Sequence, residues 1–111
     1  MEIKKKEVGC KGIKFFTEVD GREIGRAYLY IFHNNLHKEP FGYLEDVYVD
    51  KNFRREGICT KLLNEVIEEA KKEGCYKIVA TSRYNREEVH KLYERLSFKR
   101  QGIEFRLDFH N

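Results

Sequence analysis

Dense runs of β-forming residues occupy the first part of the chain. Ile13–Val19 and Glu23–Phe32 are rich in aromatic and β-branched side chains, which is typical of strands. Asp20-Gly21 between them predicts a tight hairpin turn, because glycine tolerates positive φ. His33–Pro40 is polar and ends in proline, which predicts a loop. Phe41–Val49 alternates two sets of side chains and is predicted as a third strand.

After the third predicted strand, the apolar pattern changes to a helical period. Apolar side chains recur every four residues over about Gly57–Glu73, which predicts an amphipathic helix. Tyr76–Thr81 is a short apolar run that favours a buried strand. A second apolar helical face follows Asn85, a candidate N-cap, and ends near Ser97.

The C-terminal residues are expected to complete the sheet. Lys99–Gln101 and Glu104–Asp108 are each expected to supply a terminal strand. The predicted order is β-β-β-α-β-α-β(-β), an α/β sandwich with a mixed, mostly antiparallel sheet. Because no repeat or linker interrupts the 111 residues, residues 1–111 are expected to form a single domain.

Composition excludes several classes of protein. Lys plus Arg number 22 and Asp plus Glu 19, and this net charge of +3 excludes a histone-like coat for nucleic acid. No apolar stretch approaches the roughly 20 residues of a membrane span, and the N-terminus lacks a secretory signal. The three cysteines form neither a disulfide framework nor a zinc knuckle, which favours a reducing, cytoplasmic location. His33 and His37 fall in a loop, so no metal site is predicted.

The junction between the third strand and the first helix has features of an anion site. The N–H groups at a helix start are unpaired, and the helix dipole favours negative charge there. Gly57 and the small Cys59 leave room for a phosphate, and Lys51–Lys61 carries four basic side chains against one acidic, a local charge of +3. The Gly-Lys-Ser/Thr and Gly-x-Gly-x-x-Gly nucleotide motifs are absent. By itself, the pattern leaves open a phosphate site or a basic turn without a ligand.

Three blocks of this sequence resemble one protein family. Arg54–Cys59 (RREGIC) resembles an Arg/Gln-x-x-Gly-x-Gly/Ala signature, and Tyr43–Asp50 (YLEDVYVD) looks like the strand before it. Asn85 followed by Leu92–Phe98 (LYERLSF) looks like a second conserved block. In this order and spacing, over roughly Gly42–Arg100, they resemble the GNAT superfamily of acetyl-CoA-dependent N-acetyltransferases.

Two positions depart from the pattern of that family. Cys59 stands where glycine or alanine is usual, but cysteine is small enough for close approach to the backbone. Ser97 stands where glycine is usual, just past the predicted helix, where glycine supplies a left-handed turn. The second departure concerns local geometry rather than chemistry.

The resemblance implies a binding site for acetyl-CoA. Pantetheine would lie along the central strand like an added strand, and the pyrophosphate would bind mostly to backbone N–H groups of the loop. The implied contacts are Val47, Tyr48 and Val49 on the strand, and Arg54, Arg55, Glu56, Gly57, Ile58, Cys59 and Thr60 on the loop. Arg54 would support the loop or meet a phosphate. Asn85 is implied as a further contact, although a role as N-cap explains it equally well.

The chemistry implied by the resemblance is direct attack of an amine on the thioester in a ternary complex. Glu45 matches the family's base, directly or through water; otherwise it is a solvated strand carboxylate. Asp46 would point to the opposite face of a regular strand, unless a bulge changes the parity. Tyr93 matches the general acid, although its apolar helical face alone indicates core packing. A helix start would lower the pKa of Cys59, but direct transfer needs no acetyl-cysteine.

The first hypothesis is therefore an N-acetyltransferase acting on a primary amine of a peptide, a protein or a small cationic molecule. A non-catalytic acetyl-CoA or CoA-binding module is the alternative, and an RNA-binding sandwich lacks the aromatic motif and basic face. Family members carry one or two helices before the hairpin, for which only Met1–Gly12 is available, with Ile3–Val8 as a first strand. The acceptor site would then be open or completed by a second subunit. A homodimer is expected on exposed edge strands, with no nucleic-acid or membrane partner.

Overall fold

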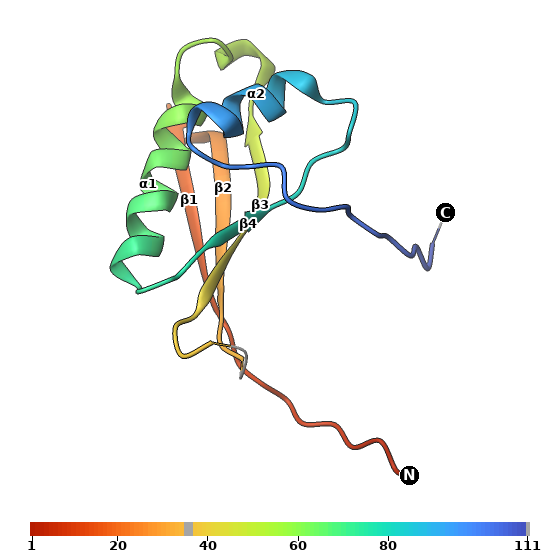
Figure 1. Ribbon diagram of the computed structural model, residues 1–111. Helices are drawn as coiled ribbons and strands as arrows, with labels where there is room; N and C mark the ends of the chain where they lie inside the picture. The colour runs from red at the N-terminus through yellow and green to blue at the C-terminus, as the bar shows by residue number, and fades with distance from the viewer. Residues whose placement is uncertain (35–36, 111) are drawn as a thin grey trace. The chain divides into compact units, whose positions relative to one another are not determined.

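The computed structural model describes residues 1–34 and 37–110. The chain folds as two compact units, Met1–Ala80 and Thr81–Asn111. Figure 1 shows the elements of each unit along the chain. Within the described residues, neither helix has the length and apolar character needed to cross a membrane.

The first unit is built on a four-stranded sheet. Its strands are β1 (Lys11–Val19), β2 (Arg22–Phe32), β3 (Phe41–Val49) and β4 (Ile78–Ala80), in the spatial order β1-β2-β3-β4. β1 pairs with β2 and β2 with β3 in antiparallel fashion, whereas β4 runs parallel to β3. The mixed, mostly antiparallel sheet predicted from the sequence is confirmed.

The predicted turn between β1 and β2 is also confirmed. Asp20 and Gly21 have φ values of 52° and 75°. Two successive positive φ angles are the requirement of a type I′ hairpin turn, whose twist matches that of the strands it joins. The turn sets the register of β1 against β2, and that register decides which side chains face the core.

The helix α1 (Ile58–Lys72) covers one face of this sheet (Figure 1). The core lies between them, and its fully buried large side chains are Leu29, Ile31, Leu63 and Val66. Burial of each such side chain contributes roughly 1.5–3 kcal/mol. Alternate residues of β2 therefore face α1, and the intervening ones lie on the opposite face of the sheet.

The second unit contains α2 (Glu87–Arg95). Its N-cap residue is Arg86, without a side-chain cap, so the prediction that Asn85 is the N-cap was wrong by one position. At its C-terminus, Ser97 takes the left-handed conformation with φ 75°. The Ser97 and Phe98 N–H groups donate to the Glu94 and Tyr93 carbonyls, both at 3.0 Å, which is a Schellman motif formed without glycine.

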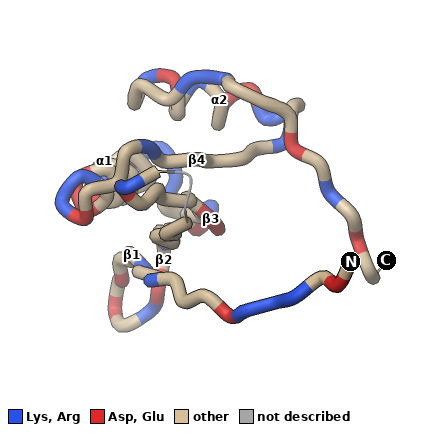
Figure 2. Tube along the Cα trace, turned by 60° about the horizontal axis from the view of Figure 1, so that its bottom comes forward, with Lys and Arg blue, Asp and Glu red and all other residues tan. Residues whose placement is uncertain are grey.

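The ends of the chain differ from the expectation. Among the described residues, neither 1–10 nor 99–110 contains a strand, so Ile3–Val8, Lys99–Gln101 and Glu104–Asp108 are not strands in this structure. Figure 2 shows the charged residues along both ends. An alternating pattern makes a segment suitable for a sheet, but a strand forms only where a partner edge pairs with it.

Candidate functional site

The outer edge of β3 is open along the second half of the strand. β4 pairs with β3 only from Gly42 to Leu44. Beyond Leu44, the part of the chain that the structure describes provides no strand beside β3 on that side. Val47, Tyr48 and Val49 lie in this open stretch. Their edge can therefore accept an extended ligand through backbone hydrogen bonds.

A β-bulge interrupts β3 at the start of the open stretch. Tyr28 is paired with Glu45 and Arg26 with Tyr48, so Asp46 and Val47 together lie opposite Ala27. Asp46 has φ 50°, in the left-handed region. The extra residue reverses the alternation of faces, so that Glu45 and Tyr48 share the face turned away from α1.

Asp46 is fixed by a bidentate ion pair with Arg26 across the bulge. Its carboxylate accepts hydrogen bonds from Arg26 Nε at 2.9 Å and Nη2 at 3.1 Å. The hydrogen bond from Arg26 lowers the pKa of Asp46, and the pKa of the guanidinium is raised in turn. Asp46 thus reaches the face that carries Arg26, and of the two alternatives left open by the sequence the structure has the bulge.

Glu45 is exposed on the same face and remains unengaged. Its cross-strand partner is Tyr28. Among residues 1–34 and 37–110, none forms a hydrogen bond or ion pair with the Glu45 carboxylate. Arg26 is occupied by Asp46, and a second carboxylate, Glu23, is held by Lys14. Glu45 is therefore a carboxylate beside the open edge of β3 that is held in no ion pair.

The side chain of Arg54 anchors the following loop to β3. Arg54 Nε donates to the Val49 carbonyl at 2.8 Å. The guanidinium also lies over the ring of Tyr48, 5.7 Å from its centroid, and Arg26 lies 4.9 Å from the same centroid. Such cation–π contacts contribute about 0.5–1 kcal/mol at exposed sites. One network, Asp46–Arg26–Tyr48–Arg54, thus connects the bulge to the start of the loop, and of its members the sequence analysis did not identify Arg26.

The loop between β3 and α1 ends in a helix start with free N–H donors. A short 3-10 turn, η1 (Lys51–Phe53), follows Asp50, whose carboxylate caps it through Asn52 N at 2.9 Å. α1 begins after Gly57, which provides no side-chain cap. Its first intrahelical bond runs from Lys61 N to the Gly57 carbonyl at 3.1 Å. The N–H groups of residues 58–60 precede this bond and are oriented for an anion.

Gly57 combines a glycine conformation with open space. Its φ is 79°, and an added Cβ would meet no atom within 4 Å. Arg55, two residues earlier, also has positive φ, 68°. Non-glycine residues in this region are uncommon and concentrate at functional sites. The loop therefore leaves its backbone accessible, and the residues present fit a phosphate group.

Cys59 in the first turn of α1 is not an activated thiol. The residue is partly buried, and this burial raises the pKa of the thiol above its ordinary value. The pKa, which the helix start was expected to lower, is raised instead, because burial disfavours the charged thiolate. Cys59 is therefore a small, partly buried side chain in the first turn of α1.

Tyr93 and Asn85, the remaining predicted site residues, belong to the second unit. Tyr93 lies on α2, and its ring packs on that of Phe98 with centroids 5.3 Å apart. This contact joins the two ends of the Schellman motif. Asn85 is exposed, immediately before the N-cap of α2.

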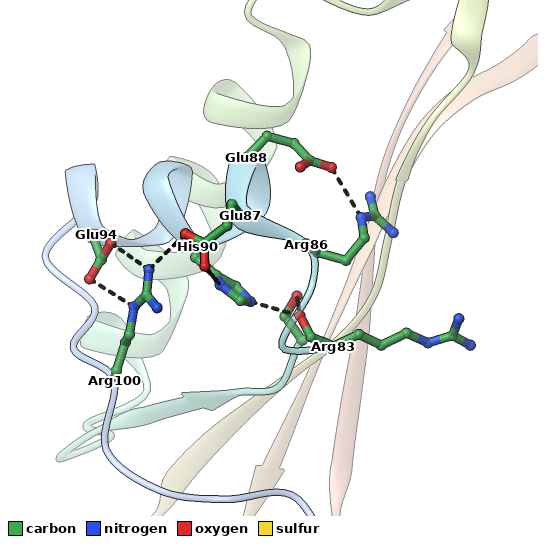
Figure 3. Close-up of polar contacts among 8 residues, drawn as sticks. Arg83, Arg86, Glu87, Glu88, His90, Glu94 and Arg100 are labelled. Atoms are coloured by element: carbon green, nitrogen blue, oxygen red, sulfur yellow. Dashed lines mark hydrogen bonds and ion pairs between the residues drawn. The ribbon is translucent and has the colours of Figure 1, made fainter.

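A polar network secures α2 to its flanking segments (Figure 3). Arg100 pairs with Glu94 at 3.2 Å and with Glu87 at 3.3 Å, and the hydrogen bond from Arg100 lowers the pKa of Glu87. His90 Nε2 contacts the Arg83 carbonyl at 2.8 Å. The His90 side chain is only 13% exposed. This network fixes the start and end of the helix that carries Tyr93.

Two hollows in the first unit lie apart from Glu45. One of about 380 Å³ is situated where β2 ends and β3 begins, and Cys10, Phe32 and Phe41 are among its lining residues. The other, of about 300 Å³, lies between β1 and the start of α1, with Ile58 in its wall. Neither is lined by Glu45, so the site is defined by the β3 edge and the loop.

Comparison with known families decides what this arrangement is. The model of the acetyltransferase (GNAT) family matches residues 5–98. The chain belongs to the GNAT family. The matched range contains β3 with its open edge, the loop and both helices, so the sequence resemblance is confirmed over most of the chain.

Two curated relatives and one solved structure illustrate the likeness of this GNAT chain. A glucosamine 6-phosphate N-acetyltransferase of Trypanosoma brucei brucei is 32% identical over 95 residues, 85% of this chain and 63% of that protein. An aminoglycoside N(6')-acetyltransferase type 1 of Acinetobacter genomosp. 13 is 30% identical over 69 residues, 62% of this chain and 47% of that protein.

The solved structure supports the fold. An acetyltransferase of Trypanosoma brucei is 29% identical and superposes with a TM-score of 0.79, covering 91% of this chain and 70% of that chain. The GNAT chain thus spans less than two thirds of the two curated relatives and more than two thirds of this structure.

Proposed function

We propose that this GNAT chain is an N-acetyltransferase that transfers the acetyl group of acetyl-CoA to a primary amine. The observation that carries the proposal is the open edge of β3, which leads through an Arg54-anchored loop to the uncapped start of α1. An extended amide chain with a pyrophosphate at one end matches both features. The backbone of Val47–Val49 would pair with the amides, and the N–H groups at the start of α1 would bind the pyrophosphate.

In the proposed reaction, two side chains of the protein handle the protons. Glu45, directly or through water, accepts the proton that an ammonium group must lose before it becomes a nucleophile. The amine nitrogen then bonds to the thioester carbonyl carbon, and a backbone N–H of the β3 edge stabilises the oxyanion. The carbon–sulfur bond breaks, and Tyr93 gives its phenolic proton to the departing thiolate. The second proton of the attacking nitrogen leaves through water and restores the Tyr93 phenol, so that the products are the acetamide and the free thiol.

The acceptor that we propose is a small cationic amine, with a peptide or protein amine as the alternative. The names of the two curated relatives include glucosamine 6-phosphate and aminoglycosides, which are both amino sugars. Glu45 is an unengaged carboxylate with Tyr28 directly across the strand pair, a combination that favours an alkylammonium group.

Calorimetric titration followed by an assay of thiol release tests this function. The protein should bind acetyl-CoA and CoA, and absence of binding at millimolar ligand would contradict the proposal. Release of CoA thiol in the presence of an amine and peptide library should fall about 100-fold or more in Glu45→Gln and in Tyr93→Phe.

Matched variants separate catalysis from general damage. Glu18→Gln removes another exposed strand carboxylate, and Tyr84→Phe removes another phenol of the second unit, so both should retain the wild-type rate. Equal rates in wild type and Tyr93→Phe would show that Tyr93 is not the acid. Binding without thiol release for any acceptor would favour a CoA-binding module, an outcome to weigh because the chain covers 63% of the Trypanosoma relative.

A further inference from the structure

The backbone N–H groups of β3 point to different sides at the two ends of the strand. Gly42 N donates to the Lys77 carbonyl, just before β4, at 2.9 Å. Asp50 N donates to the Ile24 carbonyl of β2 at 2.7 Å. The N–H groups of a strand alternate between its two sides with a period of two, so residues 42 and 50 of a regular strand would point the same way. One reversal therefore lies between them, at the bulge where Asp46 has φ 50°.

The bulge directs a backbone donor to the open edge of β3. Counted back from Asp50, the Tyr48 N–H points to β2, and the N–H groups of Val47 and Val49 point to the open edge. Without the extra residue, the Val47 N–H would point to β2 instead. This donor comes two residues after Glu45, the proposed base, and it suits the oxyanion of the proposed reaction.

One arginine of β2 contacts the residues on both sides of Val47. Arg26 donates two hydrogen bonds to the Asp46 carboxylate, at 2.9 and 3.1 Å. Its guanidinium also lies 4.9 Å from the centroid of the Tyr48 ring. A bidentate guanidinium fixes the orientation of a carboxylate as well as its distance, because its donors are held in one plane. Arg26 thus restricts the chain immediately before and after Val47.

Arg26 acts from a strand that is paired along both edges. β2 lies between β1 and β3 and pairs with each of them. Ala27, which follows Arg26 and lies opposite the bulge, has no exposed surface. Asp46, in contrast, adopts a left-handed conformation that is sterically unfavourable for a residue with a side chain. The ion pair therefore holds a strained residue against a fixed element.

We infer that Arg26 is a positioning residue for acetyl transfer, an inference that rests on the function proposed above. Through Asp46 and Tyr48, Arg26 maintains the bulge and keeps the Val47 N–H directed at the open edge. A donor that is in place before the reaction stabilises the charge that develops only in the transition state. Loss of Arg26 should therefore slow turnover more than it weakens binding.

Steady-state kinetics of Arg26→Gln in the full-length protein test this role. With an acceptor that the wild type acetylates, kcat should fall about tenfold or more, while the KM for that acceptor and the calorimetric Kd for CoA stay within about threefold. Arg22→Gln removes another arginine of β2 that pairs with a carboxylate, that of Asp50 at 3.5 Å, and should retain the wild-type kcat. Equal kcat in Arg26→Gln and wild type, or a loss confined to KM, would overturn the inference.

Two substitutions of Asp46 separate the backbone conformation from the charge. Asp46→Gly and Asp46→Ala both remove the carboxylate that Arg26 binds, but glycine takes positive φ without steric cost and alanine does not. The kcat of Asp46→Gly should therefore exceed that of Asp46→Ala about fivefold or more. Equal kcat in these two variants would also overturn the inference. Urea unfolding shows whether each variant is folded in the assay, and if Arg26→Gln is not, the Asp46 variants alone decide.

Failure of this inference differs from failure of the proposed function. Suppose that the wild type binds acetyl-CoA and releases thiol, and that the rate depends on Glu45 but not on Arg26. The proposed function would then stand, and the role of Arg26 would be overturned. A wild-type protein that binds no CoA, or that releases no thiol with any acceptor, would overturn both, because Arg26 would have no reaction to position.

Discussion

Two backbone conformations shape the loop before α1 at the scale of single residues. Gly57 adopts φ 79° at the N-cap of α1, and Arg55 adopts φ 68° two residues earlier. Glycine takes this conformation without steric cost, whereas a side chain costs roughly 1–2 kcal/mol there. The strain at Arg55 and the open space at Gly57 lie in the loop that we propose binds the pyrophosphate.

Substitution of Gly57 tests this role. Gly57→Ala should weaken CoA binding about tenfold or more, because the methyl group disfavours the backbone conformation and enters the space left for the ligand. Calorimetric titration with CoA measures the change.

A second glycine provides a matched control. Gly21 has φ 75° and also has no atom within 4 Å of an added Cβ, but it lies in the turn between β1 and β2. Gly21→Ala carries the same strain and should leave CoA affinity within about twofold of wild type. If both variants lose affinity equally, the effect is one of folding and Gly57 does not contact the ligand.

Single residues also show what the sequence can and cannot predict. The position of the left-handed turn after α2 was predictable from the resemblance, and Ser97 takes that conformation although it is not glycine. The pKa of Cys59 was predicted in the wrong direction, because the helix start is visible in the sequence and the burial of the thiol is not. The partial burial of His90 is equally invisible in the sequence, because its contact with the Arg83 carbonyl depends on the path of the chain before α2.

At the scale of elements, the bulge in β3 and the ion pair across it determine the geometry of the site. Arg26 on β2 holds Asp46 in its left-handed conformation and also contacts the ring of Tyr48. Both partners are partly exposed, with side-chain exposures of 31% and 46%, so solvent screens their attraction. An exposed pair of this kind contributes about 0–1 kcal/mol.

A double-mutant cycle measures this pair. Arg26→Gln, Asp46→Asn and the double variant should yield a coupling energy of about 0.5–1 kcal/mol from urea unfolding at pH 7. The exposed pair Lys71 and Glu68 on α1, with N–O distance 3.4 Å, is the control and should couple more weakly. Equal coupling energies in the two cycles would show that Arg26 stabilises the bulge no more than an ordinary surface ion pair does.

The same pair has a predicted pH dependence. The pKa of Asp46 is lowered in the folded protein, so the unfolded chain binds the proton more tightly. The stabilisation from Asp46 is therefore complete above its unfolded pKa, about 3.9, and is lost as the pH falls through the lower folded value. The free energy of unfolding, followed from pH 6 to pH 2, should decrease less in Asp46→Asn than in wild type.

The elements themselves were largely predictable. Runs of aromatic and β-branched residues located β1 and β2, and an alternating pattern located β3. The four-residue apolar period located α1 to within one residue at each end. The sequence left the bulge open only as an alternative, because it depends on the register against Ala27, a residue of another strand. For the same reason the sequence offered Arg26 only as a charge within a predicted strand, without its partner.

At the scale of the whole molecule, the excess positive charge is concentrated in one segment of the chain. The net charge of +3 equals the charge of Lys51–Lys61 alone, and the other residues comprise 18 basic and 18 acidic side chains. The four basic side chains of this segment lie, in the sequence, on both sides of a helix start that has no side-chain cap. A screened attraction between this segment and an anionic ligand is therefore expected.

Salt should distinguish the parts of the ligand. Raising ionic strength from about 0.01 M to 1 M shortens the Debye length from about 30 Å to 3 Å, so CoA binding should weaken several-fold. Pantetheine, which lacks the phosphates, should bind more weakly at low salt and should show no such decrease. Titration calorimetry of both ligands over a salt series measures this, and an equal decrease for the two would argue against a phosphate site at the loop.

The bulge in β3 also has a consequence for how this protein tolerates insertions and deletions. The side chains of a strand alternate between its two faces. The bulge shifts this alternation by one residue, so that Leu44 and Val49 both face the core although five positions separate them. Without the bulge, the same residues would follow a single alternation, which would turn Tyr48 toward α1 and Val49 toward water. The number of residues in this part of β3 is thus constrained, as well as their types.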